Sequence, residues 1–197
     1  MKWMRCLVAV LAVMFLRTEV FADDPGRWYV AVKAGSYHPD TSNDGIVKKL
    51  DAGFIGEIGA GYLVTRNLAV EAGFMTCKAE QTLPAADVAE STIRGVSAAA
   101  FLLTLRGVLP LANDRVEISA GAGIGSYQLD VEIKDPPPPP VNRTESRSET
   151  GYHFTVGADY NVTRRIALGL EYKWFSVKPE STELGGDALS LGVRYRF

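Results

Sequence analysis

The chain has 197 residues, of which 47% are apolar and 22% are charged, and its formal net charge is −2 at pH 7. That length fits about one domain, and the slight excess of acid gives no indication of nucleic-acid binding. Two cysteines and two histidines are too few for a disulfide framework, and their spacing matches no metal site. The sequence therefore predicts no cofactor.

The first 22 residues have the features of a signal peptide. Two basic residues precede an apolar run, Cys6–Leu16, and Val20-Phe21-Ala22 has the small residues that signal peptidase accepts. The run is too short for a membrane-spanning helix, which needs about 20 residues. We therefore expect cleavage after Ala22, export of the chain, and one mature domain over residues 23–197.

Eight segments with strand character follow the signal peptide. They are Arg27–Tyr37, Gly53–Val64, Leu68–Gln81, Ile93–Leu109, Val116–Ile133, Gly151–Asn161, Ile166–Val177 and Ala188–Phe197. Apolar and polar or small residues alternate along them, which is the pattern of strands with two different environments on their two sides. The fourth segment loses its alternation over residues 98–103 and is also compatible with a short buried helix. Its position between a long and a short connection favours a strand.

The connections between these segments alternate in length. The short ones are Thr65–Asn67, Pro110–Arg115 and Val162–Arg165, and the long ones are His38–Ala52, Thr82–Thr92, Lys134–Thr150 and Lys178–Asp187. A run of prolines, Pro136–Pro140, cannot pair in a sheet and predicts a stiff tip on the third long connection. Short turns at one end and long loops at the other are typical of an all-β, transmembrane, antiparallel up-and-down β-barrel with eight strands, short periplasmic turns and long extracellular loops.

The two faces of the predicted strands differ as such a barrel requires. One face is apolar, with aromatic residues near both ends, and fits contact with lipid. The other face carries a polar network whose expected role is structural: Lys33, Glu57, Glu71, Arg106, Glu117, His153, Asp159, Glu171, Lys173, Arg194 and Arg196. An eight-stranded barrel is only wide enough for its own side chains, so these groups should pair and seal the lumen. The turn Pro110–Arg115 suggests that Arg106 lies opposite Glu117.

The signal peptide, the strand RWYVAVKAGSY (residues 27–37) and the terminal LGVRYRF (residues 191–197) resemble the small eight-stranded outer-membrane barrels of Gram-negative bacteria. That family includes the membrane domain of outer-membrane protein A and the OmpX-type barrels. The resemblance implies residence in the outer membrane, contact with its lipid and lipopolysaccharide, and insertion by the barrel-assembly machinery. The expected signal for that machinery is Leu191, Val193, Tyr195 and Phe197. The chain ends at the barrel, so peptidoglycan tethering is not implied.

Three functions are consistent with this sequence. The first is a non-enzymatic structural or surface-interaction protein that acts through its four extracellular loops, whose ligand the sequence does not name. The second is a narrow channel for small or hydrophobic solutes. The third is an enzyme that modifies lipid A, for which the only candidate catalytic cluster is His153, Thr155 and Asp159. These three side chains should point into the lumen, away from any acyl chain, so we expect no catalytic site.

Overall fold

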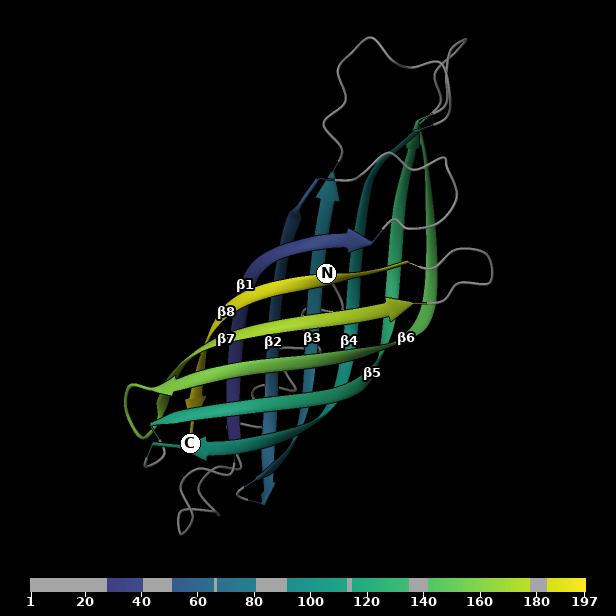
Figure 1. Ribbon diagram of the computed structural model, residues 1–197. Helices are drawn as coiled ribbons and strands as arrows, with labels where there is room; N and C mark the ends of the chain where they lie inside the picture. The colour runs from purple at the N-terminus through teal and green to yellow at the C-terminus, as the bar shows by residue number, and fades with distance from the viewer. Residues whose placement is uncertain are drawn as a thin grey trace.

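A computed structural model describes residues 28–40, 51–65, 67–80, 92–112, 115–134, 142–177 and 184–197. Its eight strands are β1 (Trp28–Asp40), β2 (Gly53–Thr65), β3 (Leu68–Glu80), β4 (Thr92–Leu111), β5 (Val116–Lys134), β6 (Asn142–Asn161), β7 (Ile166–Val177) and β8 (Leu184–Arg196). Each strand pairs antiparallel with its neighbours in sequence, and β8 pairs with β1, which closes the barrel (Figure 1). The predicted fold class is confirmed. The predicted signal peptide and proline run lie outside the described residues.

The seam between β1 and β8 shows how the alternating sequence closes the barrel. Val32 of β1 pairs with Val193 of β8, and both side chains face outward. On the inner face, Gly35 crosses the seam so closely that an added Cβ would collide with the backbone of Leu189. Because only glycine fits there, this position is fixed by backbone approach rather than by a turn. Full closure leaves no sheet edge within the membrane.

The strands differ in length, and this is where the sequence-based boundaries were least accurate. β4, β5 and β6 have 20, 19 and 20 residues, whereas the other five have 12 or 13. The segment Asn142–Thr150 was predicted as loop but forms the first part of β6, paired with β5 up to Lys134 and Asn142. Its Ser, Thr, Arg and Glu residues lack the apolar alternation of a lipid-facing strand, so the sequence predicted a loop.

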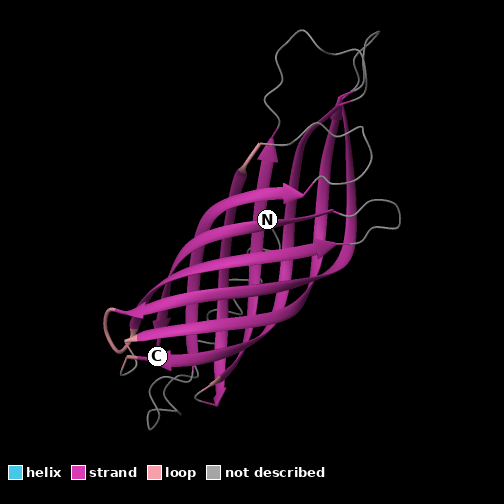
Figure 2. Cartoon of the chain, in the orientation of Figure 1, coloured by secondary structure: helices cyan, strands magenta, loops and turns pink. Residues whose placement is uncertain are grey.

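The short-helix alternative for the fourth segment is excluded, because β4 is a strand throughout. Alternation does persist there: Ala98, Ala100 and Leu102 are buried inside the barrel, while Phe101 and Leu103 are half exposed on its outside. The pattern was hidden because both faces are apolar in this part of the wall. Figure 2 shows a wall built of strands.

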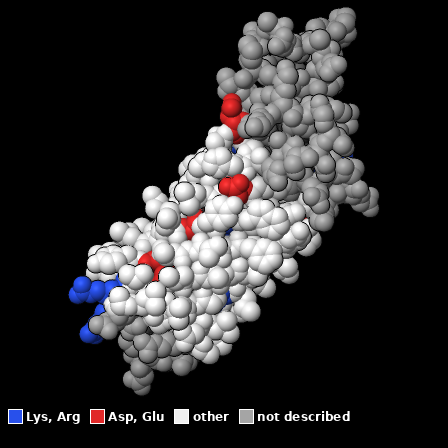
Figure 3. Space-filling model, viewed as in Figure 1, with Lys and Arg blue, Asp and Glu red and all other residues white. Residues whose placement is uncertain are grey.

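The outer surface carries the apolar belt expected of a membrane barrel. Every strand exposes large apolar side chains, and the described wall in Figure 3 is mostly uncharged. Aromatic pairs occur at both ends, with ring centroids 4.8–5.6 Å apart: Trp28–Tyr62 and Tyr195–Phe197 at the turn end, Phe74–Phe101 and Tyr152–Trp174 at the loop end. A membrane-crossing strand needs about 9–11 residues, so even β7 is long enough. The described part of the chain has no helix long and apolar enough to cross a membrane.

Candidate functional site: a barrel interior in two layers

The inner layer nearer the turns is a network of charged side chains. Lys33, on β1, lies at its centre, and its Nζ donates hydrogen bonds to Glu57 (2.8 Å), Glu71 (3.2 Å) and Glu171 (3.0 Å). These carboxylates come from β2, β3 and β7, so one lysine joins three strands across the lumen. Lys173 of β7 also pairs with Glu57. The network therefore fastens opposite walls of the barrel to one another.

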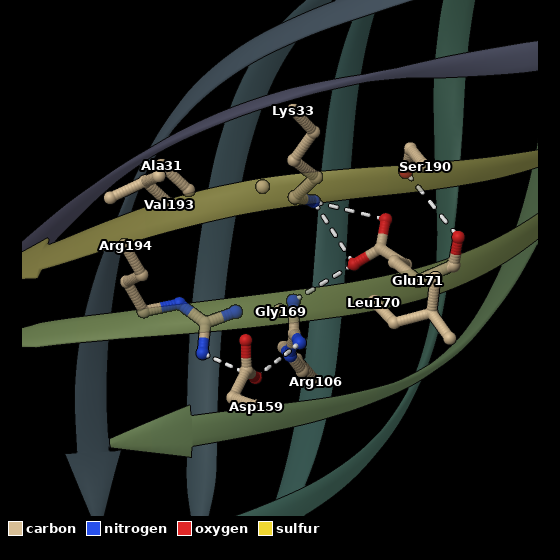
Figure 4. Close-up of a pocket in the computed structure, with 11 residues that line it drawn as sticks. Ala31, Lys33, Arg106, Asp159, Gly169, Leu170, Glu171, Ser190, Val193 and Arg194 are labelled. Carbon is tan, nitrogen blue, oxygen red and sulfur yellow. Dashed lines mark hydrogen bonds and ion pairs between the residues drawn. The ribbon is translucent and has the colours of Figure 1, made fainter. Parts of the chain in front are cut away.

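Arg106, on β4, is the second centre of this network. Its guanidinium nitrogens lie 3.1 Å from Glu171, 3.3 Å from Asp159 and 3.5 Å from Glu71, and one of them donates to the Ser119 hydroxyl at 2.7 Å. Figure 4 shows Arg106 between Asp159 and Glu171. One arginine thus contacts three carboxylates, which the planar fork of its donors permits.

Arg194, on β8, completes the charged layer. It contacts Asp159 at 2.6 Å, as Figure 4 shows, and its guanidinium carbon lies 4.9 Å from the ring centre of Tyr29. The Tyr29 hydroxyl in turn donates to Glu71 at 2.9 Å. The layer has four basic and four acidic members, none more than 8% exposed: Lys33, Arg106, Lys173, Arg194, Glu57, Glu71, Asp159 and Glu171. Buried charges need such compensation because they have lost their hydration.

Glu117 and Arg196 lie closer to the turns and pair with each other at 2.5 Å. Asn161 supports the pair through its amide, which donates to Glu117 at 2.9 Å. The predicted pairing of Arg106 with Glu117 was wrong, because the register sets Glu117 opposite Pro110 and Arg106 opposite Gly121. The β4–β5 ladder continues to Leu111 and Val116, so the turn is shorter than the sequence suggested.

His153 lies where the charged layer meets the apolar one. It is fully buried, and its Nε2 lies 2.8 Å from the Thr104 hydroxyl, while its Nδ1 has no hydrogen-bond partner in the described structure. Asp159 is held by Arg106 and Arg194. The cluster His153, Thr155 and Asp159 on β6 is therefore divided. His153 contacts Thr104, whereas Asp159 contacts Arg106 and Arg194. Within the described ranges, no group of three or more His, Cys, Asp or Glu residues could hold a metal ion.

The inner layer nearer the loops is apolar, which the sequence analysis missed. Phe175 lies between Tyr37 and Tyr127, with ring centroids 5.5 Å and 5.9 Å apart and the rings nearly parallel. The buried cluster consists of Tyr37, Ile55, Met75, Cys77, Ala79, Ala98, Ala100, Leu102, Tyr127, Leu129, Phe175, Val177 and Ala188. The signal was available, because Met75 and Cys77 share the inward face of β3 with Glu71. The prediction of a polar lumen rested on the charged residues of that face.

Little space remains in the charged layer. A cavity of about 10 Å³ lies among Lys33, Arg106, Asp159, Glu171 and Arg194, as Figure 4 shows. A cavity of that size has room for about one water molecule. Side chains thus occupy the described interior at both levels. The arrangement can hold the walls together, but its charged groups already bind one another.

Comparison with known proteins agrees with this architecture. The model of the outer membrane protein beta-barrel domain matches residues 8–197. Neisserial surface protein A shares 19% identity and a TM-score of 0.65, over 86% of this chain and 97% of its own. Ail, the attachment invasion locus protein of Yersinia pestis, shares 17% identity and a TM-score of 0.53, over 88% of this chain and 100% of its own.

A major outer membrane protein from Thermus thermophilus shares 15% identity and a TM-score of 0.51, over 86% of this chain and 99% of its own. No curated protein sequence gave a match. Identities this low establish the fold alone, whereas the family model extends over nearly the whole sequence. The chain belongs to the outer membrane protein beta-barrel domain family, whose location is the outer membrane.

Proposed function

We propose that this protein is a non-enzymatic outer-membrane barrel that acts on the cell surface rather than through its lumen. The observation that carries the proposal is the filled interior. A layer of mutually paired charges and a layer of packed apolar side chains lie one above the other between the two openings. An eight-stranded barrel of this kind is a packed structure rather than a pore. On this proposal, the parts of the barrel that extend beyond the membrane carry out the surface interaction.

The wall formed by β4, β5 and β6 is the part that extends furthest (Figure 1). β6 pairs with β5 from Asn142 onward, but its pairing with β7 begins only at Gly151. Among the described residues, the β7-facing edge of Asn142–Thr150 therefore has no strand beside it. This edge is about 30 Å long, from about 3.4 Å per residue in an antiparallel strand. We name it the β6 edge.

A strand edge with no described strand beside it presents backbone N–H and C=O groups in a regular row, and an extended segment of another protein can pair with that row. In the described part of the β5–β6 hairpin, the Ser146 hydroxyl donates a hydrogen bond to Asp130 at 2.5 Å. The structural neighbour Ail is described as an attachment protein, which supports the same kind of role here. We infer that the β6 edge binds an extended segment of a surface partner.

Shortening the hairpin tests this role. Because Asp130 pairs with Ser146, residues 131–145 can be replaced by Asn-Gly, a two-residue turn that suits a hairpin. Bacteria displaying the shortened barrel should adhere to cultured epithelial cells at least about fivefold less than those displaying the full barrel. A matched control removes only Pro136–Pro140 and should adhere normally, because it keeps the β6 edge. The shortened barrel loses residues 142–145 of the β6 edge and keeps 146–150. Unchanged adhesion at equal insertion level would therefore exclude the outer part of this edge as the binding surface.

A further inference from the structure

The two ends of the barrel carry opposite charge. In the sequence, the four long connections defined above contain eleven acidic and six basic residues, whereas the three short turns contain four arginines and one aspartate. Figure 3 shows basic side chains gathered at the turn end of the described barrel. The paired charges of the lumen do not contribute to this difference, because they are buried and balanced. The three short turns are therefore basic, although the protein as a whole is slightly acidic.

Three of these arginines lie in turns that are fixed to the barrel. Arg115 precedes β5, and Arg164 and Arg165 precede β7; all three are exposed. The backbone N–H of Asn161 donates to the Arg115 carbonyl at 2.8 Å, and that of Arg196 donates to the Arg165 carbonyl at 2.7 Å. Within the described ranges, the three side chains make no ion pair.

The neighbouring residues indicate at what depth in the membrane these arginines lie. Tyr160 and Ile166, which flank the β6–β7 turn, point outward and are 52% and 39% exposed. Tyrosine at the end of an apolar belt lies at the level of lipid headgroups in membrane barrels. Arginine side chains beside that belt therefore reach the phosphates of the leaflet at the turn end. A guanidinium binds phosphate through two parallel hydrogen bonds, which a lysine cannot do.

We propose that Arg115, Arg164 and Arg165 form a binding site for the headgroup phosphates of anionic glycerophospholipids in the leaflet at the turn end. Clusters of basic residues beside a membrane attract anionic lipid in this way, and salt weakens the attraction. The site holds the turn end at the membrane surface and enriches anionic lipid around it. It depends on the membrane orientation of the barrel and not on the proposed role of the β6 edge.

A tryptophan placed beside the site reports which lipid is adjacent. The mature chain, residues 23–197, has Trp28 and Trp174, both of which can be replaced by Phe, and Ile166→Trp then supplies one reporter next to Arg165. The refolded protein is inserted into phosphatidylcholine vesicles that contain phosphatidylglycerol. Either lipid is supplied in brominated form, which quenches tryptophan fluorescence on contact. The ratio of the two quenching constants gives the preference for the anionic lipid.

We expect about a threefold to fivefold preference for phosphatidylglycerol at low salt, falling toward one in 0.5 M NaCl. Replacing Arg115, Arg164 and Arg165 by Gln should abolish the preference at low salt as well. Lys78→Gln, which removes an exposed charge at the loop end, should leave it unchanged. A second reporter that retains only Trp174, at the loop end, should show no preference. Boiling-dependent gel mobility shows whether each variant is folded.

Three results would overturn the proposal. They are equal quenching by both lipids, a preference that survives the triple substitution, and a preference that inorganic phosphate removes more effectively than NaCl of the same ionic strength. The last result would mean that the arginines bind a free anion rather than a lipid headgroup. Adhesion of the hairpin-shortened barrel has no bearing on any of these readings, so failure of one proposal is distinguishable from failure of the other.

Discussion

At the scale of single residues, the interior is organised by side chains that reach across the barrel rather than along one strand. Arg106 leaves β4 and meets carboxylates from β3, β6 and β7. Lys33 leaves β1 and meets carboxylates from β2, β3 and β7. Because each of these cations balances several carboxylates, removing one cation affects more than a single ion pair.

Arg106→Ala should lower the free energy of unfolding by about 3–5 kcal/mol, because it leaves three buried carboxylates undercompensated. In phosphatidylcholine vesicles, which contain no anionic lipid for the turn-end site, Arg164→Ala should change it by less than about 0.5 kcal/mol. Urea unfolding in lipid vesicles, followed by tryptophan fluorescence, measures both. Equal stabilities of the two variants would mean that the charged layer contributes nothing to the fold.

At the scale of elements, the alternation of the sequence was a reliable guide to which side chains face inward and a poor guide to which of them meet. β7 has the bounds that the sequence predicted, and all eleven residues of the expected inner network lie on inward positions of their strands. The partners of Arg106 were not predictable, since they lie on strands that are not adjacent to β4 or that pair with it in an unknown register. Period-two patterns carry no information about contacts across a lumen.

The β4–β5 turn also illustrates this limit. Ala112 has a positive φ of 49°, a conformation that is unfavourable for a residue with a Cβ, and nothing in the sequence marks it. Ala112→Gly should therefore raise the free energy of unfolding by about 0.5–1 kcal/mol, whereas Ala112→Val should lower it by at least as much. Unfolding midpoints in urea, compared with those of the parent barrel, give the sign of each change. A destabilised Ala112→Gly would contradict the assignment of strain to this residue.

At the scale of the whole molecule, the proposed function leads us to expect that the two inner layers act as seals in series. The charged layer would still block the lumen if the apolar one were opened, and the reverse holds as well. A dry apolar constriction stops ions by excluding water, whereas a paired charged layer stops them because its groups bind each other. On this expectation, ions can cross the barrel only after changes in both layers.

We therefore expect the refolded barrel, residues 23–197, to give no current steps in a planar bilayer. Tyr127→Ala with Phe175→Ala opens the apolar layer alone, and Glu71→Ala with Arg106→Ala opens the charged layer alone and removes one charge of each sign. Each pair should stay silent, because the other layer is intact. The variant that combines all four substitutions, if gel mobility shows that it is folded, should give reproducible current steps. Steady current through the unchanged protein would instead favour the narrow-channel function, and current through only one of the paired variants would identify the layer that forms the true seal.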